Sequence, residues 1–182
     1  MSEIKLQTKE ELEIFMNPTR QEILRTLAVA GKPVTPKFLA DKIGISPSSI
    51  QFHIKKLEGL GLVLLDHTEI IRGIHARFYI AADTEVTLLG SNNNTQDRQL
   101  LLMESYFGKL LDSLGKKRQR TALADKEVFS KETNVFTGVA FLTDDEVQEL
   151  SAIIRSYLKN HNQKKDGTNP WEYGILACRA ED

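Results

Sequence analysis

The chain has 182 residues and a mass of 20.6 kDa, enough for one medium domain or two small ones. Hydrophobic residues make up 41% and charged residues 27%, which excludes a largely disordered chain and a disulfide-dense scaffold. No apolar run approaches the roughly 20 residues that span a bilayer, no signal-peptide core follows Met1, and the single cysteine, Cys178, has no internal partner. We therefore expect a cytoplasmic protein without a membrane partner.

The net charge of −1 hides an uneven distribution of charge along the chain. Residues 17–77 contain nine lysines and arginines against five acids, a net +4, whereas the stretches before and after them are acidic. A charge cluster of this kind attracts a polyanion even when the total charge is near zero. Residues 17–77 are therefore the candidate region for a nucleic-acid contact.

Helix-start and helix-stop signals divide the first half of the chain into short elements. Thr8 and Glu11 form a capping box. The predicted N-cap side chains are those of Thr8, Asn17, Thr35 and Ser46. Four helices are expected at 8–16, 17–31, 35–44 and 46–59. Two strands, 62–67 and 75–81, are expected to form a hairpin with Gly73 in its turn.

A polar stretch, 91–95, marks the predicted boundary between a domain at 1–90 and a second one at 95–182. Beyond it, apolar residues recur at alternating spacings of three and four, which is typical of a heptad seam on a long helix. The seam consists of Leu100, Met103, Phe107, Leu110 and Leu114. A dimer interface is the favoured interpretation, and an intramolecular core is the alternative.

The end of the chain predicts a small α/β module. Strands are expected at 134–142 and 171–178, on either side of a helix at 143–160 that begins with a second capping box. These elements could enclose a small pocket lined by Tyr157, Trp171 and Tyr173, although a plain structural core is slightly favoured.

Helices followed by a glycine-tipped hairpin, within about 75 residues, predict a winged helix-turn-helix. Its helix-turn-helix, 35–57, has a small residue, Ala40, for a close helix crossing and Gly44 for a left-handed turn. Apolar residues at the expected spacing lock the two helices together: Leu39, Ile43, Ile45 and Ile50. The expected fold class is α+β and mainly α, with an N-terminal winged helix-turn-helix, a long C-terminal dimerisation helix and a small α/β module.

Three stretches resemble ArsR-type winged-helix regulators. They are Asn17-Pro18-Thr19-Arg20 with its following Ile23 and Leu24, the run from Leu39 to Val63, and Arg72 to Tyr79 as a basic wing. The match covers about residues 12–81. It implies prokaryotic transcription control by a DNA-binding homodimer that responds to a signal. The cysteine pair of the metal-sensing members is absent, so neither a metal nor another cofactor is expected.

Candidate DNA contacts follow from the expected helix faces. Ile50, Ile54 and Leu57 should face the core, and the opposite face of the helix should enter the major groove. That face carries Ser46, Ser48, Ser49, Gln51, Phe52, Lys55 and Lys56. Gln51 suits adenine, Phe52 a thymine methyl group, and the lysines suit phosphates. Thr35 and Lys37 suit a phosphate at a helix N-terminus, and Arg72, His75 and Arg77 on the wing suit the flanking backbone or minor groove.

Each of these residues also has a simpler interpretation. Serines at a helix start are usually caps, and Phe52 could pack on the wing or on a partner. His53 is expected to be a packed, hydrogen-bonded histidine. His67 and His75 could approach each other across the hairpin, but two histidines make a poor metal site. The sequence has no glycine-rich phosphate loop and no nucleophile elbow, so we do not expect an enzyme.

The sequence therefore predicts a homodimeric, sequence-specific regulator that binds double-stranded DNA at an inverted repeat. A repressor is favoured over an activator, and an unidentified small-molecule effector remains open as a further partner. The alternative is a winged-helix module that binds protein without contacting DNA, which the near-neutral net charge favours.

Overall fold

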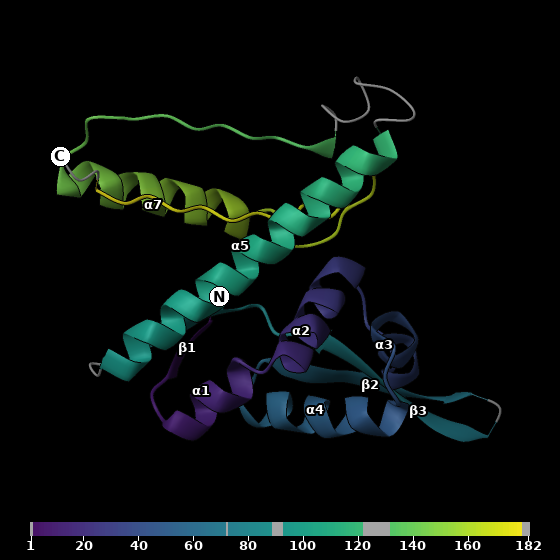
Figure 1. Ribbon diagram of the computed structural model, residues 1–182. Helices are drawn as coiled ribbons and strands as arrows, with labels where there is room; N and C mark the ends of the chain where they lie inside the picture. The colour runs from purple at the N-terminus through teal and green to yellow at the C-terminus, as the bar shows by residue number, and fades with distance from the viewer. Residues whose placement is uncertain (1, 72, 89–92, 122–131, 180–182) are drawn as a thin grey trace. The chain divides into compact units, whose positions relative to one another are not determined.

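The computed structural model describes residues 2–71, 73–88, 93–121 and 132–179. They form two compact units (Figure 1). The winged-helix unit comprises Met1–Thr95 and His161–Pro170, and the C-terminal unit comprises Gln96–Asn160 and Trp171–Asp182. The expected fold class, mixed α and β but mainly helical with an N-terminal winged helix-turn-helix, is confirmed.

Capping side chains set the first two helices. At α1 (Lys9–Phe15), the Glu11 backbone N–H donates to Thr8 Oγ1 over 3.1 Å, and the Thr8 N–H donates to Glu11 Oε2 over 2.9 Å. These backbone donors lower the pKa of Glu11, because they favour its ionised form. At α2 (Pro18–Ala30), the Asn17 side chain accepts from two backbone N–H groups, and Gly31 ends the helix with a left-handed φ of 57°.

The helix-turn-helix consists of α3 (Pro36–Ile43) and α4 (Pro47–Gly59). Thr35 caps α3 and Ser46 caps α4, each by accepting from the backbone N–H three residues later. Between them Gly44 has a φ of 84°, a conformation that side chains with a Cβ rarely adopt. The predicted caps and the turn are therefore confirmed.

The wing is an antiparallel hairpin of β2 (Val63–Ile71) and β3 (Ile74–Ala81) that extends beyond α3 and α4 (Figure 1). Gly73 has a φ of 78° in its turn, as predicted. The first strand runs four residues further than expected, because its outer part pairs with β3 although it has no core beneath it.

The sequence analysis missed a second sheet. It consists of β1 (Ser2–Leu6) and β4 (Thr84–Leu88), which pair in parallel with Ile4 opposite Val86. The two strands lie about eighty positions apart in the chain, so no local pattern links them. Leu6 is buried in this arrangement, which anchors the N-terminal segment on the winged-helix unit.

The core of the winged-helix unit lies where α2, α3, α4 and the base of the wing meet. Its most completely buried side chains are Leu6, Ile23, Leu39, Ile50, Ile54, Leu57 and Val63. Three of the seven lie on α4 at spacings of four and three, so one stripe of this helix faces the core.

The polar segment His161–Pro170 belongs to the winged-helix unit although it follows the C-terminal helix in sequence. The Asn162 side-chain amide donates to Asp83 Oδ1 over 2.6 Å. The Lys164 side chain lies against Gly31, where an added Cβ would come within 3.0 Å of it.

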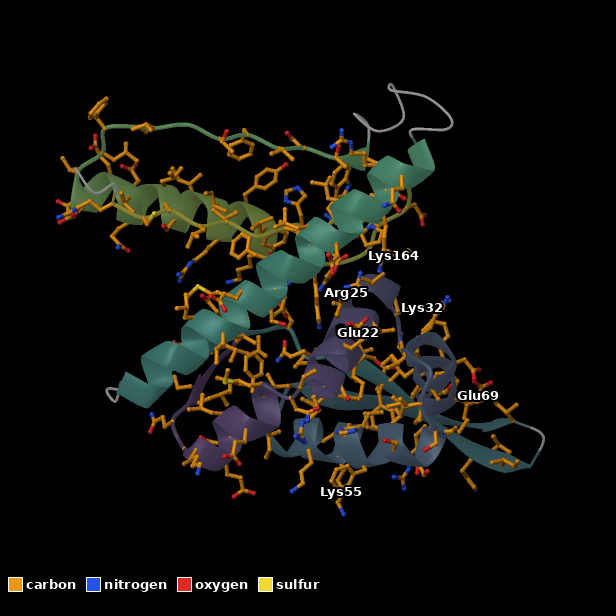
Figure 2. The ribbon with its side chains drawn as sticks, viewed as in Figure 1. Glu22, Arg25, Lys32, Lys55, Glu69 and Lys164 are labelled. Atoms are coloured by element: carbon orange, nitrogen blue, oxygen red, sulfur yellow. The ribbon has the colours of Figure 1, made fainter. Side chains whose placement is uncertain are left out.

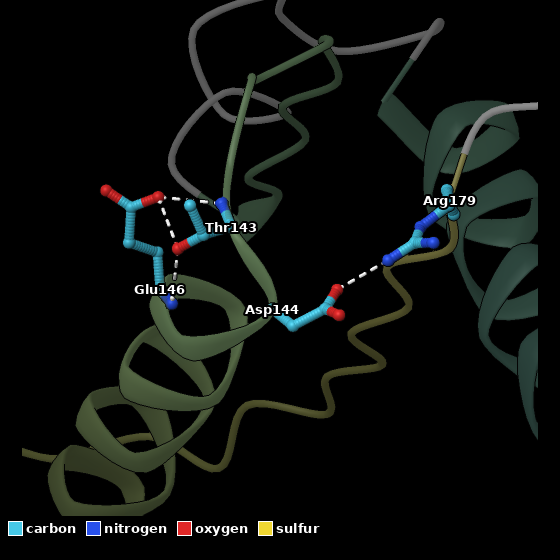
Figure 3. A network of polar contacts seen from close by, with 4 residues as sticks. All are labelled: Thr143, Asp144, Glu146 and Arg179. Atoms are coloured by element: carbon cyan, nitrogen blue, oxygen red, sulfur yellow. Dashed lines mark hydrogen bonds and ion pairs between the residues drawn. The ribbon is translucent and has the colours of Figure 1, made fainter.

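The C-terminal unit contains α5 (Asn93–Thr121), which begins at the end of the winged-helix unit, and α7 (Asp144–Lys159). Thr143 and Glu146 form the predicted capping box at the start of α7 (Figure 3). The two predicted strands at 134–142 and 171–178 are wrong: neither segment is paired in a sheet. A strand needs a hydrogen-bonding neighbour, and neither segment has one in the described part of this chain.

The last described segment returns along α7 to its beginning. Arg179 Nη2 lies 2.5 Å from Asp144 Oδ1, at the start of the helix (Figure 3). Within the described residues, no helix combines the length and the apolar character that crossing a membrane requires.

We expect Ile54→Ala to lower the free energy of unfolding of the winged-helix unit by about 2–5 kcal/mol, because it leaves a cavity at a fully packed site. Urea denaturation followed by circular dichroism measures this loss. Gln51→Ala, on the exposed side of the same helix, is the control and should change stability by less than about 0.5 kcal/mol. Equal losses in the two variants would contradict the assigned orientation of α4.

Candidate nucleic-acid interface

The face of α4 opposite its buried stripe is polar and accessible. Ser46, Ser48, Gln51 and Lys55 are exposed, and Ser49 and Lys56 are half-buried. Phe52 is 58% exposed, although its ring also makes an edge-to-face contact with His53 at 5.4 Å between centroids. The seven candidate residues therefore lie either on the solvent-accessible face of α4 or at the N-terminus of this helix.

The serines at the start of α4 form a small hydrogen-bonded group. Ser46 Oγ accepts from the Ser49 backbone N–H over 3.2 Å and lies 3.0 Å from Ser48 Oγ. Ser46 is thus a cap, as the simpler interpretation held. Capping leaves the other backbone N–H groups of the first turn pointing outward, where the positive end of the helix dipole favours an anion.

Lysines of α3 and α4 differ in what they contact. Lys37 Nζ lies 2.5 Å from Asp41 Oδ1, one helical turn away, in an exposed ion pair. Exposed pairs of this kind contribute little to stability, so a phosphate group can replace the carboxylate at low cost.

Lys55 projects from α4 away from the rest of the winged-helix unit, whereas Lys32 lies on the other side of that unit (Figure 2).

The wing is less basic than the sequence analysis expected. His75 and Arg77 are exposed on β3 and share one face, but Arg72 lies outside the described residues. Glu69 and Asp66 on β2 offset their charge (Figure 2 labels Glu69). Near the turn the wing exposes three isoleucines, Ile70, Ile71 and Ile74. A phosphate contact from the described part of the wing therefore depends on His75 and Arg77.

The two wing histidines do not approach each other as a pair. The strand register sets His67 opposite Phe78, on which its ring stacks at 4.4 Å, and sets His75 opposite Ile70. The two pairs lie an odd number of positions apart along β3, so their side chains point to opposite faces of the hairpin. Over the part of the chain that the structure describes, no group of three or more His, Cys, Asp or Glu residues is arranged to hold a metal ion.

Two partly or fully buried polar side chains of α2, Arg20 and Gln21, were missed by the sequence analysis. Arg20 Nε, Gln21 Oε1 and His53 Nδ1 are buried and make no hydrogen bond within the described residues. Gln21 does donate from its amide to the Phe15 carbonyl. Burial, and then the nearby positive charge of Arg20, lower the pKa of His53. The expected packing of His53 holds, but its expected hydrogen bond is not made at Nδ1. Arg20 and Gln21 follow an N-cap in sequence, where polar residues are ordinary, so no local signal marks them as buried.

None of the predicted seam residues on α5 is fully buried in the single chain. Leu100 and Met103 are exposed, and Phe107, Leu110 and Leu114 are half-buried. The backbone of Gly174 lies against the ring of Phe107, where an added Cβ would come within 2.9 Å of Cε1. Part of the seam is therefore covered by the chain's own C-terminal segment, and the rest is accessible.

The sequence of residues 15–66 matches a family model described as a helix-turn-helix domain. This match spans α2 to the start of the wing. No curated protein sequence matches the chain. The matched domain and the arrangement from α2 to β3 define a winged helix-turn-helix protein, and they support a DNA-binding regulator of transcription.

Several solved structures are similar to the chain. NolR from Sinorhizobium fredii has 26% sequence identity, with 53% of this chain and 81% of that chain covered and a TM-score of 0.33. A possible transcriptional regulator from Methanosarcina mazei has 12% identity, with 59% and 86% covered and a TM-score of 0.35. A MarR family regulator from Neisseria meningitidis has 15% identity, with 80% of each chain covered and a TM-score of 0.34. TM-scores of this size carry no argument, so the class depends on the family match and on the local architecture.

We expect the stability of the winged-helix unit to fall as the pH drops below about 6.5, the ordinary pKa of histidine. The pKa of folded His53 is lower than that of the unfolded chain, so below this pH the unfolded chain takes up a proton that the folded state resists. Urea denaturation at about pH 7.5, 6.5 and 5.5 measures the effect. His53→Gln, which cannot titrate, should show a weaker pH dependence than the wild type, and an unchanged dependence would contradict the role given to burial.

Proposed function

We propose that the protein is a homodimeric, sequence-specific regulator that binds double-stranded DNA at an inverted repeat. The observation that supports this best is α4: one stripe of the helix is buried, and the opposite face presents serine, glutamine, phenylalanine and lysine side chains to solvent. A helix of this shape fits the major groove, where side chains from its N-terminal half contact base edges.

Each contact has a chemical role in this proposal. Gln51 forms a bidentate pair with adenine N6 and N7, and Phe52 packs on a thymine methyl group. Lys55, Lys56 and Lys37 contact phosphates, which position the helix without selecting sequence. His75 and Arg77 contact the flanking backbone or minor groove. The serine group at the start of α4 and Thr35 at the start of α3 bind phosphates at helix N-termini.

Two copies are required by the inverted repeat. The α5 seam brings them together, which sets two recognition helices about one DNA turn apart. The favoured mode is repression, in keeping with the resemblance to ArsR-type regulators. A signal or small effector would change the relative positions of the two heads, and it would need different affinities for the two states to do so.

The alternative function is a protein-interaction module without DNA contact. The wing favours it specifically, because its charge is close to balanced and its tip exposes three isoleucines. Apolar surface of this kind is more usual at a protein interface than against a phosphate backbone.

We expect Lys55→Glu to abolish specific DNA binding, because it replaces a phosphate-binding cation with an anion in the groove. The target duplex is first selected from random DNA by the wild-type protein at two salt concentrations. Fluorescence anisotropy on that duplex then measures the affinity of the variant. Selection of an inverted repeat with half-sites about 10 bp apart would support the dimeric regulator.

The matched control is Lys32→Glu, which makes the same charge change on the other side of the winged-helix unit (Figure 2). It should keep binding within a few-fold of the wild type at moderate salt. Equal affinities of Lys55→Glu and the wild type would overturn the contact proposed for α4. If selection enriches no sequence and binding disappears with salt, only charge attraction is present, and the protein-interaction module becomes the better proposal.

We expect Leu110→Glu to shift the protein from dimer to monomer, because it places a charge in the middle of the α5 seam. Sedimentation velocity measures the change, and circular dichroism checks that the helix content is kept. Lys109→Glu, at the neighbouring exposed position, is the control for the added negative charge. A dimer that persists in Leu110→Glu would place the interface elsewhere.

A further inference from the structure

The described residues of the C-terminal unit form no buried core in the single chain. All the buried apolar side chains of the described residues belong to the winged-helix unit. In the C-terminal unit no described residue is buried, and α7 buries none of its sixteen residues. Folding of a unit of this size normally requires buried apolar surface, and the described residues of this unit do not supply it by themselves.

The accessible apolar area is large enough for a stable protein interface. Six aromatic side chains in this unit are more than half exposed: Tyr106, Phe136, Phe141, Tyr157, Trp171 and Tyr173. At about 150–250 Å² for each aromatic side chain, they expose on the order of 600 Å². The exposed leucines, isoleucines and valines add to this, and a standard interface buries about 800 Å² per partner. A small ligand cannot cover such an area.

Two segments have the composition of strands but no strand partner. Residues 134–142 contain Val135, Phe136, Val139 and Phe141, and every residue from 134 to 142 is exposed, with Phe141 at 98%. This segment has no charged residue and no proline, and residues 171–178 have a single charge, at Glu172. Natural proteins protect exposed strand edges with charges or prolines. With one charge between them, the two segments lack most of this protection, which supports their being paired in the assembled protein.

The segment 171–178 adjoins the interface already proposed on α5. Gly174 lies against the ring of Phe107, in the middle of the seam, where an added Cβ would displace the end of the ring. Arg179, at the end of the segment, contacts Asp144 at the start of α7 (Figure 3). The segment therefore contacts α5 at Gly174 and the start of α7 at Arg179.

The C-terminal unit carries charges of both signs. Acidic residues lie at the start of α7, at Asp144, Asp145, Glu146 and Glu149, of which Asp144 pairs with Arg179 and Glu146 bonds to Thr143. A basic group lies near the end of α5, at Lys116, Lys117 and Arg118, of which Lys117 pairs with Glu132. A surface that carries both signs is complementary to itself under two-fold symmetry, whereas a partner of one sign would be repelled at one end.

We propose that residues 134–142 and 171–178 form β-strands by pairing with the same segments of a second copy of this chain. The C-terminal unit thereby obtains a sheet and a buried core that one chain lacks. This inference rests on the homodimer given under the proposed function and adds its second interface. An antiparallel strand and its two-fold mate bond each other along their facing edges, an arrangement that two-fold symmetry allows for a strand and its own copy.

Hydrogen–deuterium exchange of the full chain tests the proposal, at concentrations where sedimentation shows monomer and where it shows dimer. We expect peptides from both segments to exchange at least about tenfold more slowly in the dimer than in the monomer, because their amides become paired. Cys178 gives a second readout: its exposed thiol should react more slowly with a thiol reagent in the dimer.

Val139→Glu is the variant that tests the strand directly. Val139 is 81% exposed in the single chain, so the substitution should leave the folding of the monomer unchanged. In the dimer it buries an unpaired charge, and the dissociation constant should rise at least about tenfold. The control is Gln148→Glu, which adds the same charge at an exposed polar position of α7 and should leave the dissociation constant unchanged.

The outcomes separate this inference from the proposed function. A wild-type dimer with fast exchange in both segments, or a Val139→Glu dimer of normal strength, would overturn the strand pairing and leave the homodimer intact. Slow exchange in the monomer would mean that both segments are already protected within one chain. This result would also overturn the strand pairing between copies. A wild-type protein that stays monomeric at every concentration would overturn the homodimer and the strand pairing together, and the apolar surface would then belong to a different partner.

Discussion

The burial of one stripe of α4 is the constraint on which the winged-helix unit depends. Ile50, Ile54 and Leu57 are buried almost completely, and this packing fixes the rotation of the helix about its axis. Once that rotation is fixed, Gln51 and Lys55 must face solvent. The contact that stabilises the domain therefore also decides which side chains of α4 are accessible, so in the proposed function stability and recognition depend on the same helix.

The two units of the chain satisfy their apolar residues in different ways. The winged-helix unit closes its own core, with four capped helices, the base of the wing and the N-terminal strand all contributing. The C-terminal unit leaves Phe136, Phe141 and Trp171 in solvent. A unit that completes its core only with a partner couples its folding to assembly. In the proposed homodimer, a signal that shifts the dimerisation equilibrium would through this coupling also alter the spacing of the two DNA-binding heads.

Prediction from the sequence was most accurate where the physics is local. Caps at Thr8, Asn17, Thr35 and Ser46 satisfy backbone donors within three residues of themselves, so their effect is visible in a short stretch of sequence. The polar face of α4 was likewise predictable, because helical spacing relates it to the buried stripe. The burial of Gln21 and of the Arg20 Nε atom was not, since burial of a polar side chain depends on the helix that packs over it.

The strands show most clearly which features the sequence alone predicts and which only the tertiary structure decides. The amino-acid sequence by itself determined the limits of α1 to α4 and α7, the left-handed turns at Gly44 and Gly73, and the presence of the wing hairpin, whose strands are joined by a tight turn. Only the tertiary structure decided that Ser2–Leu6 pairs with Thr84–Leu88, and that residues 134–142 have no partner within the chain. Strand propensity is a property of a segment, whereas a strand is a property of a pair, so the partner is known only when the chain has folded.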